Sequence, residues 1–259
     1  MTHPYLSRTP TPRVFAHRGL VPVGAVDLVE NSFAAIAAAH AAGAVYVESD
    51  CHLTRDGEVV LFHDDDLSRV VGDPRLVRDV TLRELEELMA ERGGLASFAQ
   101  ALESFPDIRF NIDVKADAAA EPAGRLASSA AERVLLTSFS ERRRRAALAA
   151  AARARSSLLP ATSAGATLVA RAAAAALSGS RRLMRRTLEG IDALQVPEYQ
   201  NRIRLVTPRF LDAVHDAGVE VHVWTVNEEA DMRRLIEMGV DGLVTDRADL
   251  ALRILGSGR

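Results

Sequence analysis

Apolar positions along the chain fall into short β-branched runs, and several of these runs follow a helical segment that ends at glycine. The pattern occurs three times, at residues 37–47, 213–221 and 235–244. Glycine suits the left-handed position just beyond the last turn of a helix. Repetition of helix, glycine and strand predicts parallel βα units.

Nine apolar runs are predicted as strands, one more than an eight-stranded barrel needs. The run at Ser157–Leu159 has the weakest pattern of the nine. They are Val14–Ala16, Val45–Asp50, Val59–Phe62, Arg109–Val114, Val134–Thr137, Ser157–Leu159, Ala193–Val196, Val221–Thr225 and Leu243–Thr245.

Three helix starts lie between these runs. Thr81 and Glu84 form a capping-box pattern. Thr207 offers an N-cap before Pro208 at the first helical position. Asn227 offers an N-cap before two glutamates, which the helix dipole favours in a first turn.

The dipeptide Asp56-Gly57 lies between two predicted strands and normally indicates a β-hairpin. We expect a hairpin to place His63 and Asp50 at opposite ends of the sheet. Alternatively, residues 51–58 run back extended over roughly 25 Å, at about 3.3 Å per residue, before the next strand starts. We favour this second interpretation, with parallel strands and no helix between them, because it keeps the polar residues at one end.

The chain has 259 residues, close to the roughly 250 residues of a one-domain βα barrel. Two smaller domains would also fit, but no boundary is visible, and the alanine-rich stretch 118–177 keeps its helix and strand periodicity. We therefore expect an α/β fold with one TIM-type (β/α)8 barrel over residues 13–259. Residues 1–12 are predicted to be a flexible N-terminal arm.

Composition excludes several classes of protein. Hydrophobic residues make up 48% of the chain and charged residues 26%, as in ordinary globular proteins. The net charge of -3 gives no general attraction to nucleic acid or anionic membranes. The single cysteine, Cys51, excludes an intramolecular disulfide and a cysteine-rich zinc site. Without a secretory signal or an apolar stretch of transmembrane length, we expect a cytoplasmic protein with no stable membrane insertion.

Polar and ionisable residues collect at the carboxyl ends of the predicted strands, where βα barrels build their active sites. Interior barrel positions otherwise favour valine, isoleucine and leucine, so a charge there needs a reason. These residues are His17, Arg18, Glu48, Asp50, His63, Asp64, Asp113, Lys115, Trp224 and Asp246.

Glu48 and Asp50 lie two residues apart on one strand and therefore point to the same face. Two carboxylates that close repel each other unless a proton or a cation lies between them. Asp113 adds a third carboxylate beside Lys115, and all-oxygen ligation suits Mg²⁺ or Ca²⁺. The alternative is a set of salt bridges at the barrel rim; the histidines at the same face favour the metal site.

His17 and His63 fit a pair of proton-transfer groups, because histidine donates or accepts a proton near neutral pH. His52 lies on the same strand face as the carboxylates and could line the edge of the site. Arg18 offers bidentate hydrogen bonds to a phosphate, and Lys115 offers a point charge. A metal, two cations and two histidines together predict phosphoryl chemistry.

Eight short motifs follow one another along the chain. They are His17-Arg18-Gly19, Glu30-Asn31-Ser32, Glu48-Ser49-Asp50, Thr54-Arg55-Asp56-Gly57, His63-Asp64, Asn111-Ile112-Asp113-Val114-Lys115, Trp224-Thr225-Val226-Asn227 and Gly242-Leu243-Val244-Thr245-Asp246. The first tripeptide alone is weakly specific, but all eight in this order resemble the signature of glycerophosphodiester phosphodiesterases, over about residues 14 to 250.

The resemblance implies a TIM barrel that hydrolyses a small-molecule glycerophosphodiester substrate to glycerol 3-phosphate and an alcohol. It also implies one divalent cation, Mg²⁺ or Ca²⁺. The roles it implies are His17 and His63 as the acid–base pair; Glu48, Asp50 and Asp113 as metal ligands; Arg18, Lys115 and Trp224 as substrate or phosphate contacts; and Glu30 and Asn31 as supporting residues in the first long loop, with Glu30 near the metal.

Three features depart from the family pattern. Asp113 stands where the family usually has a glutamate, so its side chain is one methylene shorter and the metal preference is open. The loop from Arg18 to Glu30 is a few residues longer than usual, and Ser32 replaces the common threonine. We therefore expect a reshaped entrance to the site.

Two alternatives to this hydrolysis are kept. A related cyclising phospholipase D acting on lysophospholipids needs an apolar rim at the barrel mouth, and the sequence shows no aromatic cluster for one. A non-catalytic binding barrel is expected to lose a histidine or a carboxylate, and none is missing.

The runs Arg142–Arg145 and Arg181–Arg186 could contact lipid or nucleic acid. Aromatic residues make up only 5% of the chain, so we interpret the runs as solvated helix faces and predict no nucleic-acid partner.

Overall fold

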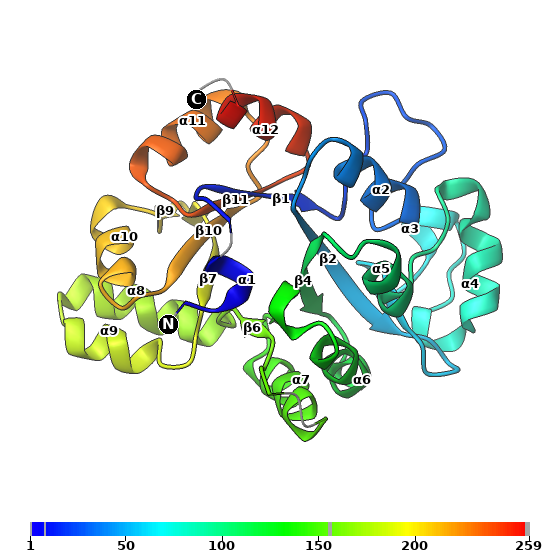
Figure 1. The fold of residues 1–259 in the computed structure, drawn as a ribbon, viewed down its shortest axis with the longest axis horizontal. Helices are drawn as coiled ribbons and strands as arrows, with labels where there is room; N and C mark the ends of the chain where they lie inside the picture. Colours follow the sequence, from blue (N-terminus) through cyan, green and yellow to red (C-terminus); the bar gives the residue numbers. More distant parts are fainter. Residues whose placement is uncertain (1, 8, 155–156, 257–259) are drawn as a thin grey trace.

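The computed structural model describes residues 2–7, 9–154 and 157–256. A ring of strands is surrounded by helices (Figure 1). The strands are β1 Arg13–His17, β2 Tyr46–Leu53, β3 Val59–Leu61, β4 Arg109–Val114, β5 Val134–Thr137, β6 Ala161–Thr162, β7 Ala193–Pro197, β8 Tyr199–Gln200, β9 Ile203–Arg204, β10 Glu220–Trp224 and β11 Gly242–Thr245.

Helices follow most of the strands and pack their apolar faces against them. They are α1 Pro4–Ser7, α2 Phe33–Ala41, α3 Ser68–Val71, α4 Leu82–Met89, α5 Phe98–Ser104, α6 Asp117–Ser128, α7 Glu141–Arg153, α8 Ala166–Ser178, α9 Arg181–Thr187, α10 Pro208–His215, α11 Glu229–Met238 and α12 Ala248–Gly256, with 3-10 turns η1 Val77–Asp79, η2 Ala90–Arg92 and η3 Ala131–Arg133.

The predicted TIM-type barrel is confirmed. Eight strands run parallel in the order β6-β5-β4-β2-β1-β11-β10-β7. An isolated parallel bridge between Ser163 and Ala193 nearly closes the ring from β6 to β7. Phe15, Tyr46, Leu135 and Val244 pack together inside the ring, each at most 3% exposed, so the barrel is a packed core.

The strand predicted at Ser157–Leu159 is displaced along the chain. Residues 155 and 156 lie outside the described part, and β6 pairs with β5 only at Ala161 and Thr162. The apolar pair Leu158-Leu159 suggested the wrong segment, because the short strand that completes the barrel carries a small residue and a threonine.

The connection after β2 corrects our preferred interpretation. β3 pairs antiparallel with β2, with Cys51 opposite Leu61 and Leu53 opposite Val59. The hairpin indicated by Asp56-Gly57 is therefore present. It does not separate the polar residues, because β2 extends three residues beyond Asp50 and β3 pairs with that extension. The amide of Phe62 donates to the carbonyl of Asp50 at 3.0 Å, which returns His63 to the level of the carboxylates.

Most of the predicted helix signals are confirmed. Thr81 and Glu84 form a complete capping box on α4, and Thr207 caps α10 with proline in its first turn. The N-cap of α11 is Glu228 rather than Asn227. The Asn227 side chain is instead held by the residues that follow β11, where its amide oxygen accepts from the amide of Asp246 at 2.9 Å.

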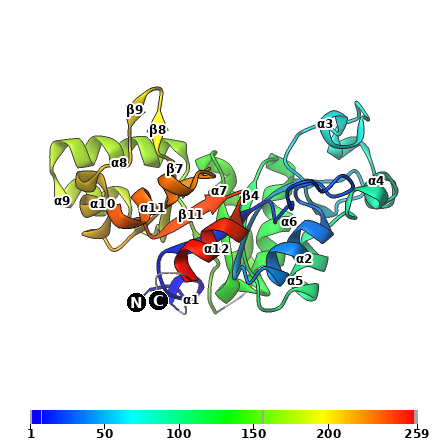
Figure 2. The ribbon, with the colours of Figure 1, turned by 90° about the horizontal axis from the view of Figure 1, so that it is seen from above.

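Within residues 1–12, predicted as a flexible arm, the segment α1 packs against the barrel. Tyr5 is fully buried and Leu6 is 2% exposed. Tyr46 Oη donates to the Tyr5 carbonyl at 2.8 Å, and Arg109 donates to the Pro4 carbonyl at 3.0 Å. One aromatic and one aliphatic side chain are enough to anchor this segment. Figure 2 shows α1 on the side of the barrel opposite the β8–β9 hairpin and α3.

No helix within the described ranges is long and apolar enough to cross a membrane.

Candidate active site

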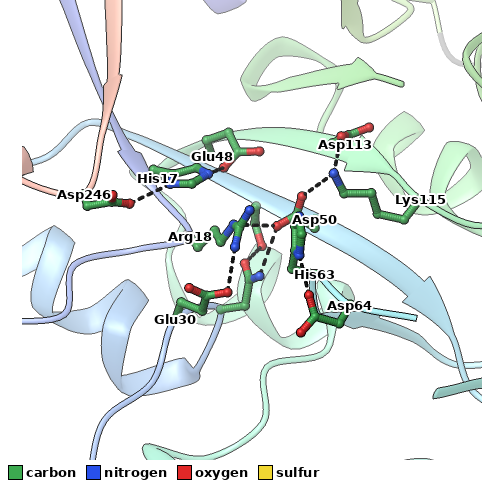
Figure 3. A network of polar contacts seen from close by, with 12 residues as sticks. His17, Arg18, Glu30, Glu48, Asp50, His63, Asp64, Asp113, Lys115 and Asp246 are labelled. Atoms are coloured by element: carbon green, nitrogen blue, oxygen red, sulfur yellow. Dashed lines mark hydrogen bonds and ion pairs between the residues drawn. The ribbon is translucent and has the colours of Figure 1, made fainter. Parts of the chain in front are cut away.

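Polar side chains form a cluster at the carboxyl ends of β1, β2 and β4 (Figure 3), and the register of these strands places them side by side. His17 on β1 is the register partner of Glu48 on β2, and Asp50 on β2 is the partner of Asp113 on β4. The antiparallel β3 pairs only with the outer end of β2, so β2 and β4 remain neighbours. Two pairs of sequence-predicted residues are thereby placed side by side.

Lys115 lies between two of the predicted metal ligands. Its Nζ is 2.9 Å from Asp50 Oδ1 and 2.7 Å from Asp113 Oδ2. Burial opposes the charged form of Lys115, but the two carboxylates outweigh it and raise its pKa. The positive charge needed between these carboxylates is therefore supplied by a side chain in this structure.

Asp50 has the most complete set of partners in the cluster. Arg18 Nε lies 3.1 Å from its Oδ2, and Asn31 Nδ2 donates to the same oxygen at 3.2 Å. Asn31 is itself held by Ser49 Oγ, which donates to its amide oxygen at 2.6 Å. Burial raises the pKa of Asp50, but the charges of Lys115 and Arg18 lower it by a larger amount. The net pKa is therefore below the usual value, and the carboxylate stays ionised.

Glu48 and Asp113 have fewer hydrogen-bond and ion-pair partners than Asp50. Burial, together with the neighbouring Asp50 charge, raises the pKa of Glu48 to about 8, and burial also raises the pKa of Asp113. Within the described residues, Glu48 Oε2, Asp113 Oδ1 and the amide oxygen of Asn111 are buried without a hydrogen-bond partner. Such unsatisfied oxygens are costly, and an oxygen-seeking cation would satisfy them.

A preformed metal cage is absent from the described ranges, since no three Asp, Glu, His or Cys side chains converge closely enough to hold an ion. Chemistry nevertheless suits a hard divalent cation, because the unsatisfied donors of Glu48, Asn111 and Asp113 are all oxygens.

His17 is oriented by an acidic residue that follows β11. Its Nδ1 lies 2.6 Å from Asp246 Oδ1, and its Nε2 lies 3.8 Å from Glu48 Oε2. Asn227 Nδ2 donates to the other Asp246 oxygen at 2.7 Å, which fixes the carboxylate. Burial lowers the pKa of His17, but the hydrogen bond to Asp246 and the charge of Glu48 outweigh it, and the net pKa is raised.

His63 has the same arrangement on the other side of the cluster. Its Nδ1 lies 2.6 Å from Asp64 Oδ1. Arg69 Nε donates to the second oxygen of Asp64 at 2.6 Å, and Arg69 also reaches Glu30 Oε1 at 2.6 Å. Both histidines thus present Nε2 as the nitrogen without a carboxylate hydrogen bond, in the tautomer or ion that their partners select.

The first long loop supplies Arg18, Glu30 and Asn31. The Arg18 amide donates to the Glu48 carbonyl at 2.7 Å, and its guanidinium lies 2.7 Å from Glu30 Oε1. Glu30 therefore lies in the cluster as expected, but it is engaged by two arginines, Arg18 and Arg69.

Trp224 lies at the end of β10 beside the exposed ring of Phe139. The two ring centroids are 5.9 Å apart at 73°, and Lys115 Nζ is 5.5 Å from the Phe139 centroid. His52, which was expected at the site edge, is buried, and its Nε2 lies 3.1 Å from the His63 carbonyl. It supports the hairpin rather than lining the site.

Sequence reasoning missed several partners of the predicted residues. Asp64 and Asp246 stood out only as polar residues at strand ends. Arg69 and Phe139 had no distinguishing signal, because their roles depend on α3 and on the end of β5 folding over the site.

Local acids pair with part of each arginine run. Arg142 and Arg143 pair with Asp117, and Arg144 is buried against Glu141 at 2.8 Å. Arg181 lies 3.0 Å from Asp216. These pairs support the interpretation as helix surfaces.

Comparison with known proteins agrees with the motif order. The model of the glycerophosphoryl diester phosphodiesterase family matches residues 17–250. A Mycobacterium tuberculosis protein named probable glycerophosphodiester phosphodiesterase 2 is 37% identical, over 93% of this chain and 89% of its own length.

Solved structures show the same fold. A glycerophosphodiester phosphodiesterase from Thermotoga maritima is 25% identical, with a TM-score of 0.68 over 93% of this chain and 97% of that one. An Oleispira antarctica phosphodiesterase, solved with the product sn-glycerol-3-phosphate, has a TM-score of 0.72 at 21% identity, over 95% of this chain and 97% of that one. With the family match spanning nearly the whole barrel, the chain belongs to the glycerophosphoryl diester phosphodiesterase family.

Proposed function

We propose that this protein hydrolyses glycerophosphodiesters to glycerol 3-phosphate and an alcohol. The observation that carries the proposal is a matched pair of histidines, His17 and His63, each with a carboxylate 2.6 Å from Nδ1, flanking a cluster that contains Arg18 and Lys115. Family membership supports it. The product bound to the Oleispira antarctica neighbour is the product expected here.

Arg18 and Lys115 are proposed to bind the phosphate. In this structure their charges face Asp50, which lies 3.1 Å from Arg18 and 2.9 Å from Lys115. An incoming phosphodiester adds acceptor oxygens beside the same cations, and charge-assisted hydrogen bonds of this kind are the stronger class. Asp50 holds both cations in position before substrate arrives, so less ordering is needed on binding.

The histidines are proposed to move protons through Nε2. One takes the proton from the attacking hydroxyl as its oxygen bonds to phosphorus, and the other protonates the alcohol oxygen as its bond to phosphorus breaks. Attack by water gives glycerol 3-phosphate directly. Attack by the substrate's own glycerol hydroxyl gives a cyclic phosphate, which water then opens to glycerol 3-phosphate. Asp246 and Asp64 keep each ring oriented. A carboxylate on Nδ1 serves this purpose because it fixes the tautomer and offsets the charge that develops on the ring.

A divalent cation, Mg²⁺ or Ca²⁺, would neutralise charge on the phosphodiester when bound. Glu48 and Asp113 are the favoured carboxylate ligands, since within the described residues each has a buried oxygen without a hydrogen-bond partner. Asn111 is an additional oxygen donor that the resemblance did not indicate. Asp50, the other predicted ligand, would have to exchange part of its contact with Lys115 or Arg18.

The test is a panel of deacylated glycerophosphodiesters with detection of glycerol 3-phosphate. Activity should disappear after exhaustive chelation and return with Mg²⁺, Ca²⁺ or Mn²⁺. Full activity without metal would refute the metal site. A cyclic phosphate as the final product, with lysophospholipids preferred, would instead identify the cyclising phospholipase reaction. The absence of any product with every metal would identify a non-catalytic barrel.

A further inference from the structure

A pocket of about 340 Å³ opens beside His17, next to the proposed reaction centre. His17 and Asp246 form one part of its wall, and Glu30, Arg69 and Arg92 contribute charged side chains. This volume is at the small end of the range for ligand pockets, roughly 300–1,000 Å³, and suits a small alcohol.

The charged side chains that line the pocket are not all engaged in ion pairs. His17 pairs with Asp246, and Glu30 is shared by Arg69 and Arg18. Arg92, by contrast, has no ion pair and no side-chain hydrogen bond within residues 2–7, 9–154 and 157–256. One positive charge at the pocket wall is therefore available to a ligand.

The backbone at Arg92 is fixed to the first long loop and to α2. The amide of Val29 donates to the Arg92 carbonyl at 3.2 Å, and the amide of Phe33 donates to the Gly94 carbonyl at 3.0 Å. Gly93 has φ +88°, and a Cβ there would lie 2.7 Å from Ser32 Oγ. Only glycine allows this close approach, so the turn that carries Arg92 is built against the pocket rather than loosely attached.

Three valines complete the wall: Val21, Val29 and Val70. These side chains give the carbon skeleton of a ligand an apolar surface to pack against, while the exposed Arg92 side chain supplies the charge. The pocket combines a cation, an apolar surface and one of the proposed proton-transfer residues, His17.

We infer that this pocket receives the alcohol part of the diester, and that Arg92 selects alcohols bearing a carboxylate or a second phosphate. The inference rests on the proposed function and specifies its substrate class. Apart from the phosphate itself, the glycerol half of a glycerophosphodiester is uncharged, so only the alcohol half makes use of an unpaired guanidinium.

Two substrates that differ by one carboxylate provide the test. sn-Glycero-3-phospho-L-serine and sn-glycero-3-phosphoethanolamine carry the same ammonium group, and only the first carries the carboxylate. We expect the wild-type protein to have the higher kcat/KM on the serine diester. Arg92→Gln should lower the ratio of the two kcat/KM values about threefold to fivefold, because an ion pair at an exposed side chain contributes below about 1 kcal/mol. Arg92→Lys should restore part of the ratio.

The matched control is Arg83→Gln, which removes the same charge from an arginine whose side chain is 85% exposed and which does not line the pocket. The ratio of its two kcat/KM values should equal that of the wild type. If Arg92→Gln cleaves both diesters and leaves this ratio unchanged, the inference is overturned and the proposed function stays intact. If the wild type cleaves neither diester, the proposed function fails for both substrates. Calorimetric affinities of the wild type and of Arg92→Gln for the two diesters then decide the inference: an unchanged affinity ratio overturns it.

Discussion

At the residue scale, the two histidines repeat one design on opposite sides of the carboxylate cluster. His17 meets Asp246 and His63 meets Asp64, each through Nδ1 at 2.6 Å. The two acids come from different places in the chain, one directly after its histidine and the other 229 residues away. Because each ring has a carboxylate at Nδ1, the structure allows either ring to act as acid or base.

His17→Ala and His63→Ala should each lower turnover by roughly 10²–10⁴-fold, because a positioned proton-transfer group contributes that much. Both side chains lie at the mouth and are partly exposed, so the unfolding midpoint should change little. Release of glycerol 3-phosphate at saturating substrate measures the effect, and His40→Ala, an exposed histidine on α2, is the control. Near wild-type turnover in either variant would remove that histidine from the pair.

Asp113 tests the metal site. Asp113→Ala should weaken activation by both Mg²⁺ and Ca²⁺, because it removes one of the buried oxygens without a hydrogen-bond partner within the described chain. Asp113→Glu lengthens the side chain by about 1.5 Å, one carbon–carbon bond, and should shift the preference toward Ca²⁺, which accepts longer and more variable bonds. Activity titrated with each metal measures both effects.

If Asp113→Ala leaves metal affinity and turnover unchanged, Asp113 serves only as the partner of Lys115, which lies 2.7 Å away. Glu30 is then the next carboxylate to test, although Arg18 and Arg69 already engage it.

At the element scale, the β2–β3 hairpin shows what local signals establish and what they leave open. Asp56-Gly57 indicated the correct turn. The error came from ending the preceding strand at Asp50, when β2 continues to Leu53 and lifts the turn away from the barrel. Strand ends depend on which neighbour supplies hydrogen bonds, and this information is absent from a single stretch of sequence.

Gly124 makes the contact between α6 and α7 possible. Glycine inside a helix is usually worse than alanine by about 1 kcal/mol, so Gly124→Ala would ordinarily stabilise the protein. Here a Cβ would lie 2.0 Å from the Ala147 carbonyl oxygen, a backbone atom that cannot rotate away. The helices would have to separate, and we expect a loss of about 1–3 kcal/mol, as for other overpacked sites.

Urea unfolding of Gly124→Ala, compared with Gly256→Ala, measures this effect. Gly256 lies at the end of α12, and a Cβ there meets no atom within 4 Å among the described residues. Equal or greater stability of Gly124→Ala would show that α6 and α7 adjust freely.

At the scale of the whole molecule, the sequence was sufficient to predict the barrel and to predict which residues form the polar cluster. The order of apolar runs and glycine-ended helices predicts a ring of parallel strands, and such a ring brings strand ends together. Distances within the cluster were not predictable. They follow from the register of β1, β2 and β4, which sets His17 beside Glu48 and Asp50 beside Asp113. For the same reason Lys115, predicted as a phosphate ligand, also acts as the bridge between two carboxylates.

The free energy of unfolding should carry a pH dependence from His215 and Asp241, which lie 2.7 Å apart away from the active site. The hydrogen bond to Asp241 raises the pKa of His215. Burial raises the pKa of Asp241, but the hydrogen bonds from His215 and from the amide of Val221 lower it by a larger amount. Its net pKa is therefore below the usual value. This pair ties α10 to β10 and to the segment before β11.

The directions of the two pKa shifts define the pH range in which the pair stabilises the fold. A raised histidine pKa gives stability that is fully present below about 6.5, the unfolded value, and is lost as pH rises through the folded value. A lowered aspartate pKa gives stability that is present above about 3.9, the unfolded value, and is lost as pH falls through the folded value. The pair should therefore contribute most between about pH 4 and 6.5.

A double-mutant cycle with His215→Gln and Asp241→Asn isolates this contribution. Urea unfolding at pH 5.5 should give a coupling energy below about 1 kcal/mol, because the His215 side chain is 38% exposed and solvent weakens such pairs. The coupling should diminish steadily toward pH 9, where the imidazole is neutral in both states. A coupling that is constant across this range, or that grows with pH, would mean that the two side chains interact as neutral hydrogen-bonding groups and that the ion pair does not form.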